Sequence, residues 1–82
     1  MPYQLDLDIQ PTEGALLRVL GTAERRGFRA TGIFGEIADL DAQRCWHIQS
    51  IGTADHPVAT ICQYLSKLVD CLSVHASPVE LA

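Results

Sequence analysis

The side chains best suited to chemistry in this sequence are scattered histidines and one pair of aspartates. A metal site needs several His, Cys, Asp or Glu ligands at short, regular spacings. His47, His56 and His75 stand far apart, and none has a companion at such a spacing. Asp6 and Asp8 share one face of an expected strand, but two carboxylates without an acid or base partner are expected to be solvated. We therefore predict neither a catalytic site nor a metal site.

The cysteines indicate packing and a reducing environment. Cys45, Cys62 and Cys71 are odd in number and form no CxxC pair, which disfavours a disulfide framework or a zinc site. Cys62 falls on the apolar stripe of an expected helix and should lie in the core. Cys71 follows that helix and is expected to be half exposed, without a neighbouring cation to lower the pKa of its thiol. No nucleophile elbow, Walker loop or GxGxxG motif is present, so no cofactor is predicted.

Gly14 marks a different kind of candidate site, one in which the backbone supplies the binding groups. It stands where the first expected strand leads into the first expected helix. Backbone N–H groups at the start of a helix lack partners, and the helix dipole favours anions there. An amino-acid carboxylate or a side chain of another protein would fit this turn. The alternative is a glycine that serves only the backbone geometry of the loop, and the residues alone leave both interpretations open.

Length and charge exclude several function classes. The 82 residues predict a single domain over 1–82, with a core at about 3–76 and a C-terminal tail at 77–82. A net charge of −4 and a pI near 5.1 argue against a nucleic-acid surface, which concentrates Lys and Arg. No apolar run approaches the roughly 20 residues of a membrane span, and the N-terminus lacks the features of a signal peptide. A cytoplasmic location is expected.

Hydrophobic periodicity predicts the elements of the first half of the chain. Residues 3–10 alternate between apolar and polar, which is typical of a strand with one buried face. A helix follows up to about Arg26, with Thr12 as its N-cap and Gly27 as its left-handed C-terminal cap. Residues 28–38 predict a second strand with a bulge at Gly32, because the apolar alternation changes parity there. The apolar stripe of the helix is Leu16, Val19, Leu20 and Ala23, widened by Leu17.

The second half predicts a hairpin, a helix and a last strand. Residues 39–43 form the hairpin connection, and 44–51 a third strand with Trp46 and Ile48 on one face and His47 on the other. Pro57 opens a second helix near its first helical position, and a short strand follows at 72–76. The apolar stripe of this helix is Val58, Ile61, Cys62, Leu65, Leu68 and Val69.

The order β-α-β-β-α-β predicts an α+β, ferredoxin-like sandwich. Its four-stranded antiparallel sheet would carry both helices on one face. The other face is left uncovered, so it must be polar or meet a partner. A chain of this length buries only roughly 60–65% of its unfolded surface, which makes a partner chain the expected source of extra stability.

The sequence resembles an ACT domain over roughly residues 3–76. The segments that carry the resemblance are GALLRVL at 14–20, RRGF at 25–28 and LSKLVD at 65–70. The last segment is similar to the small regulatory subunits of acetolactate (acetohydroxyacid) synthase, and the short length resembles the isozyme II type. This resemblance implies a noncatalytic subunit. Such subunits bind and activate the large, thiamine-diphosphate-dependent catalytic subunit in branched-chain amino-acid biosynthesis.

The resemblance also implies a homodimer, joined through sheet edges or helices, and an effector site at the first loop. The effector would be valine, leucine or isoleucine, and the residues at the matching positions are Thr12, Glu13, Gly14, Ala15 and Leu16. Related loops typically carry Asn or Asp three residues before the glycine, where this chain has Pro11. Weak sensitivity or insensitivity to feedback is therefore predicted.

Two other functions fit the same fold. One is a stand-alone ACT domain that senses a small amino acid at a dimer interface. The other is a small enzyme such as an acylphosphatase-like hydrolase. The sequence lacks a phosphate-cradling loop with a nearby Arg and Asn, and the fold alone does not imply that activity.

Overall fold

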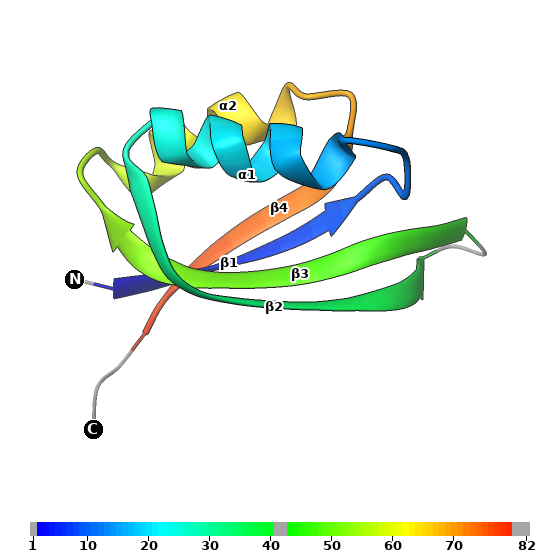
Figure 1. The fold of residues 1–82 in the computed structure, drawn as a ribbon. Helices are drawn as coiled ribbons and strands as arrows, with labels where there is room; N and C mark the ends of the chain where they lie inside the picture. Colours follow the sequence, from blue (N-terminus) through cyan, green and yellow to red (C-terminus); the bar gives the residue numbers. More distant parts are fainter. Residues whose placement is uncertain (1, 41–42, 80–82) are drawn as a thin grey trace.

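The computed structural model describes residues 2–40 and 43–79 and confirms the predicted fold. One antiparallel sheet has the strand order β2-β3-β1-β4, and both helices cover the same face of it (Figure 1). No helix in these two ranges is long and apolar enough to cross a membrane. The elements are β1 (Pro2–Ile9), α1 (Ala15–Arg25), β2 (Phe28–Leu40), β3 (Gln43–Ala54), α2 (Val58–Ser66) and β4 (Cys71–Pro78).

The core lies between the sheet and the two helices. Leu5, Leu7 and Ile9 of β1 are fully buried there, because alternate side chains of a strand point to the same face. Four of the side chains expected in the helix stripes are buried, and most of the others pack against the core from its margin. The buried four are Val19, Ala23, Ile61 and Leu65. The buried apolar side chains are Leu5, Leu7, Ile9, Ala15, Val19, Ala23, Phe28, Ile48, Ile61, Leu65 and Cys71, with Leu16, Leu20, Cys62 and Leu68 packed against them.

The bulge predicted in the second strand is present. Ala30 pairs with Gly52 and Gly32 pairs with Ile51, so Thr31 is the extra residue of β2. Because one residue is added, the apolar side chains before and after the bulge face the same side of the sheet. β2 is an edge strand that extends beyond the helices, and its Ile33 remains 53% exposed.

Two predictions for α1, its N-cap and the width of its apolar stripe, are wrong. Thr12 is not the N-cap: Gly14 takes that position, and no side chain caps the helix. The carbonyl of Thr12 instead accepts a hydrogen bond from the Ala15 amide (3.1 Å), which closes a turn before the helix begins. Leu17 does not widen the buried stripe, since it is 77% exposed. The stripe is centred on Val19, and positions two apart on a helix face different directions.

Two expectations at the end of α2 are also wrong. The helix ends at Ser66, and Val69, predicted on its apolar face, is 87% exposed. Bonds of the i+3 type, such as the Leu68 amide to the Leu65 carbonyl (3.1 Å), tighten the last turn and end the helical periodicity. Cys71, predicted to be half exposed, is buried opposite Ile9 at the start of β4, and burial raises the pKa of its thiol to about 11.

The hairpin strands are longer than the periodicity predicted. β2 continues to Leu40 and β3 spans Gln43–Ala54, while residues 41–42 of the predicted connection lie outside the described residues. β4 continues through Pro78, and residues 80–82 of the predicted tail also lie outside the described part.

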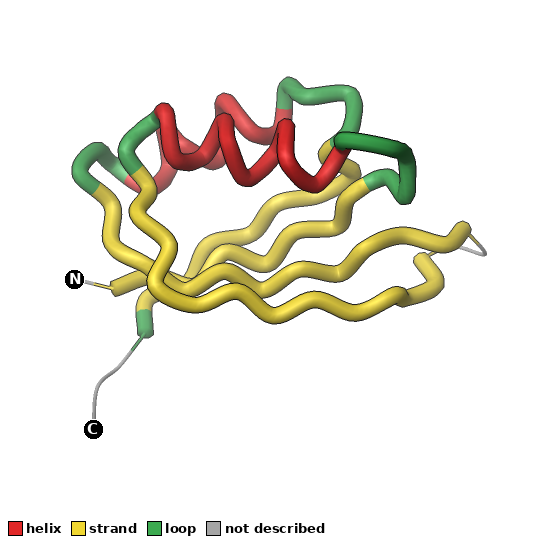
Figure 2. Tube along the Cα trace, viewed as in Figure 1, coloured by secondary structure: helices red, strands yellow, loops and turns green. Residues whose placement is uncertain are grey.

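The loops gather at the two ends of the molecule. At one end the β1–α1 and α2–β4 loops lie together, and at the other end the α1–β2 and β3–α2 loops do (Figure 2).

Candidate functional site: the loop before α1

The loop that leads from β1 into α1 is held by its own backbone. The Gln10 amide donates to the Asp70 carbonyl (2.8 Å), which fixes the loop beside the α2–β4 connection. Gly14 has φ +78°, in the left-handed region that favours glycine. The backbone geometry of this loop therefore favours a glycine at position 14. No side chain caps α1, and the Ala15 amide at this helix start donates to the Thr12 carbonyl.

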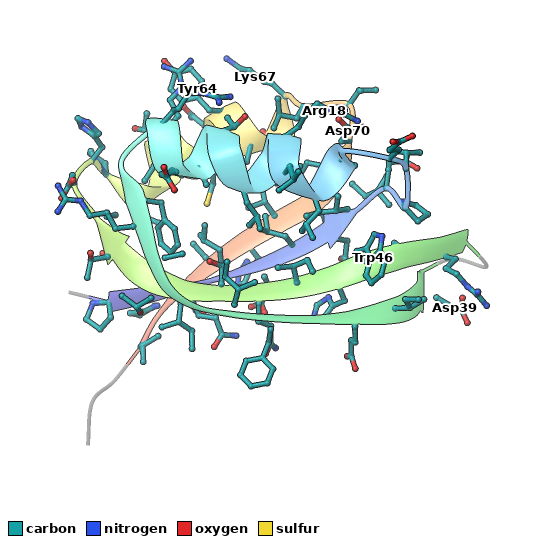
Figure 3. The ribbon with its side chains drawn as sticks, viewed as in Figure 1. Arg18, Asp39, Trp46, Tyr64, Lys67 and Asp70 are labelled. Atoms are coloured by element: carbon teal, nitrogen blue, oxygen red, sulfur yellow. The ribbon has the colours of Figure 1, made fainter. Side chains whose placement is uncertain are left out.

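An arginine lies across this loop. The Arg18 Nε is 2.6 Å from Asp70 Oδ2, and its Nη2 donates to the Glu13 carbonyl at 3.3 Å (Figure 3). A Cβ added to Gly14 would lie 2.8 Å from Arg18 Nη1, so the glycine also makes room for the guanidinium. Three interactions hold the pKa of Asp70 below 3.8, although burial opposes this. They are the hydrogen bond from Arg18, the positive charge of Arg18 and a hydrogen bond from Thr12.

The predicted effector residues divide into two groups. Thr12 and Glu13 are exposed on the loop, next to the half-buried Gly14. Ala15 is fully buried and Leu16 packs against the core, so their side chains serve the fold. The Ala15 amide is also engaged, since it donates to the Thr12 carbonyl. The structure thus adds Arg18 and Asp70 to the site.

The sequence reasoning named Arg18 and Asp70 only within the segments that resemble the family. They are 52 positions apart, and no periodicity connects them. The one available signal was that both segments resemble the same family. The antiparallel sheet, which brings the ends of β1 and α2 together, was needed to place these side chains in contact.

A comparison of the sequence with known protein families agrees with this fold. A family model described as the ACT domain matches residues 11–74. The chain is an ACT domain. No curated protein matches the chain significantly. ACT domains are regulatory and noncatalytic, and the match indicates a regulatory role linked to amino-acid binding.

This ACT domain has a second polar cluster, on the sheet face opposite the helices. Asp8 was expected to be solvated, but it is 2.9 Å from His47 Nδ1 and accepts a hydrogen bond from the Ser73 hydroxyl at 2.6 Å. The expectation for Asp8 was therefore wrong, whereas His47 lies on the uncovered face as predicted. Ser73 donates to the carboxylate and not to the imidazole, so the trio lacks the order Ser-His-Asp of a hydrolase. Within residues 2–40 and 43–79, no group of three or more ligating side chains is placed to hold a metal.

The protonation of this cluster follows from its contacts. Burial raises the pKa of Asp8, but hydrogen bonds from Ser73 and His47 outweigh burial and leave that pKa below 3.8. The hydrogen bond to Asp8 raises the pKa of His47 above 6.5, with help from the charges of Asp8, Asp6 and Glu36 and against the effect of burial. An ion pair between Asp8 and protonated His47 therefore forms at mildly acidic pH.

The left-handed turn predicts opposite effects for two glycine substitutions. Gly14→Ala should lower the free energy of unfolding by about 1–2 kcal/mol, because alanine is strained at positive φ and its Cβ meets Arg18. Gly21→Ala, within α1, should raise it by about 0.5–1 kcal/mol, since its Cβ would make only ordinary contacts. Urea unfolding monitored by circular dichroism measures both values. Equal effects of the two substitutions would contradict this account.

The Asp8–His47 pair predicts a pH-dependent contribution to stability. A raised His pKa stabilises the fold below the unfolded value of 6.5, and this stabilisation is lost as pH rises through the folded pKa. The lowered pKa of Asp8 stabilises the fold above pH 3.8, and this stabilisation is lost as the pH falls through the pKa of Asp8 in the folded state. His47→Gln should therefore cost more stability at about pH 5.5 than at about pH 8.5. In an Asp8→Asn background this difference should become smaller, because only the more distant charges of Asp6 and Glu36 remain to raise the pKa of His47. An undiminished difference would contradict the assignment.

Proposed function

We propose that this ACT domain is the noncatalytic small subunit that binds and activates the catalytic subunit of acetolactate synthase in branched-chain amino-acid biosynthesis. The observation that carries the proposal is the Arg18–Asp70 contact. It joins the GALLRVL segment to the LSKLVD segment, the part of the sequence most similar to acetolactate synthase small subunits. Two of the three segments that carry the resemblance thus support one loop. A cytoplasmic location accords with three free cysteines, which persist in reducing compartments.

The contact surface for the catalytic subunit is the Pro11–Ala15 loop. Its side chains at Pro11, Thr12 and Glu13 are exposed, and its backbone is fixed from both sides by hydrogen bonds. A preordered, exposed loop loses little conformational entropy when it binds another protein. This favours protein–protein contact as the mode of activation.

The same loop supports weak or absent sensitivity to branched-chain amino acids. Pro11 offers no side-chain hydrogen bond at the position that usually carries Asn or Asp. The cation closest to the loop, Arg18, already pairs with Asp70 at 2.6 Å. The carboxylate of an effector would have to compete with Asp70 for that guanidinium.

We further propose a homodimer that joins through β2 and α1. β2 is an edge strand of 13 residues, and such edges are natural sites for pairing with another chain. Leu17 of α1 and Ile33 and Ile37 of β2 are more than half exposed, and the β2 pair faces the helix side of the sheet. A second copy placed edge to edge would cover these apolar side chains.

Addition of this chain to the cognate catalytic subunit should raise the rate of acetolactate formation or the apparent affinity for thiamine diphosphate. Arg18→Ala should weaken the activation, because it releases the loop. Arg44→Ala removes the same charge at the hairpin end of β3 and serves as the matched control. No change in rate or cofactor affinity on addition of the wild-type chain would contradict the proposal. If one amino acid then raised the melting temperature, the stand-alone sensor would be favoured.

The homodimer predicts a change of mass in solution. Light scattering at micromolar concentration should give the mass of a dimer for the wild type. Ile33→Lys should shift it to a monomer, because a charge would be buried between the two β2 edges. Leu72→Lys on β4, the opposite edge strand, should remain dimeric. A wild-type monomer would contradict pairing through β2.

A further inference from the structure

The end of the molecule opposite the Pro11–Ala15 loop is built around a second left-handed glycine. Gly27 has φ +99°, and a Cβ there would lie 2.6 Å from the His56 ring. The Asp55 amide donates to the Gly27 carbonyl (2.8 Å), and Asp55 also pairs with Arg29 at 3.0 Å. The β3–α2 loop is therefore held against the end of α1, and it brings His56 beside the Arg25-Arg26 pair.

These groups surround a hollow of about 270 Å³ between the two helices, here called the basic hollow. The Arg26 guanidinium lies 3.8 Å from the centroid of the Tyr64 ring. This cation–π contact holds the guanidinium in place. Tyr64 of α2 and Lys67, the residue after its last turn, project on the side away from the sheet (Figure 3). The residues that line the basic hollow are Arg25, Arg26, His56, Pro57, Thr60, Ile61 and Tyr64.

The charge of the basic hollow is opposite to that of the chain. The chain carries a net charge of −4, yet two of its six basic residues line this hollow. Neither Arg25 nor Arg26 takes part in an ion pair among the described residues. Asp55 is engaged by Arg29, and Glu24 lines a separate hollow between α1 and β2. The hollow is therefore positively charged without an internal counter-charge, which is complementary to an anion.

Arginines at the end of a helix also compensate the helix dipole. That role explains the charges but not the hollow or the position of His56. Because Gly27 has no Cβ, the His56 ring can approach it closely. The Arg25-Arg26-Gly27 segment and the β3–α2 loop therefore pack against each other. Guanidinium groups bind phosphate with paired hydrogen bonds, and a hydroxyl such as that of Thr60 is a further donor. The volume lies below the 300–1,000 Å³ of typical drug-sized pockets, which suits a phosphate with a small body.

We propose that the basic hollow binds the phosphate group of a small phosphorylated metabolite. Arg25 and Arg26 supply the charge, His56 and Thr60 supply hydrogen bonds, and Gly27 allows the ring of His56 to approach. This site lies at the other end of the helices from the Pro11–Ala15 loop, and it does not depend on the acetolactate synthase partnership.

Inorganic phosphate and glycerol phosphate test the proposal in solution. Each is titrated into the ¹⁵N-labelled chain at constant ionic strength, with a hexaglutamate peptide in parallel. Saturable shifts should appear at the amides of Gly27 and His56 and be absent at Gly14. The double variant Arg25→Ala, Arg26→Ala should raise the phosphate Kd about tenfold, equivalent to about 1.4 kcal/mol. Arg44→Ala should change it less than about twofold, since Arg44 lies in the β2–β3 hairpin away from the hollow.

Each other outcome overturns the proposal. Linear shifts without saturation would show general screening by salt. Equal weakening by Arg44→Ala and the double variant would show attraction to overall charge only. Tighter binding of hexaglutamate than of either phosphate would assign the hollow to an acidic peptide. Circular dichroism of each variant confirms that a lost response does not come from unfolding.

Discussion

The burial of one face of β1 is the constraint on which the rest of the structure depends. Leu5, Leu7 and Ile9 are fully buried beneath the helices, in the middle of the sheet. Because side chains of a strand alternate, a slip of one residue would expose all three and bury Asp6 and Asp8. The register with both neighbouring strands is thereby fixed. It places Asp8 opposite His47 on β3 and Ser73 on β4, so the polar cluster is a consequence of the apolar one.

The two ends of the sandwich follow the same plan with different results. At each end two loops are joined by one backbone hydrogen bond, Gln10 to Asp70 and Asp55 to Gly27, and each has a glycine with positive φ. At the first end the nearby arginine is paired within the chain. At the second end Arg29 pairs with Asp55, whereas Arg25 and Arg26 have no carboxylate partner among the described residues. Anion binding is thus opposed by an internal carboxylate at the Pro11–Ala15 loop and favoured at the basic hollow.

Much of the fold could be predicted from local pattern, and the failures have physical causes. Strand alternation predicted the faces of β1 and β3, and the change of parity at Gly32 predicted the bulge. The start of α1 and the end of α2 were mispredicted, because a backbone turn replaced the expected Thr12 cap and a tightened turn exposed Val69. The site contacts were beyond local reasoning. Asp8 and Ser73 are 65 positions apart, and only the sheet topology brings them together.

The division between core and loop bears on how a regulatory domain of this size can respond to a partner. The interactions that determine the fold lie beneath the helices, whereas Arg18 is more than half exposed where it meets Asp70. Exposed ion pairs contribute little to folding stability, since water solvates the separated charges well. A partner that supplied its own carboxylate or cation could therefore exchange the Arg18–Asp70 contact at small cost. The loop would change its contacts while the buried face of β1 kept the sheet and both helices in place.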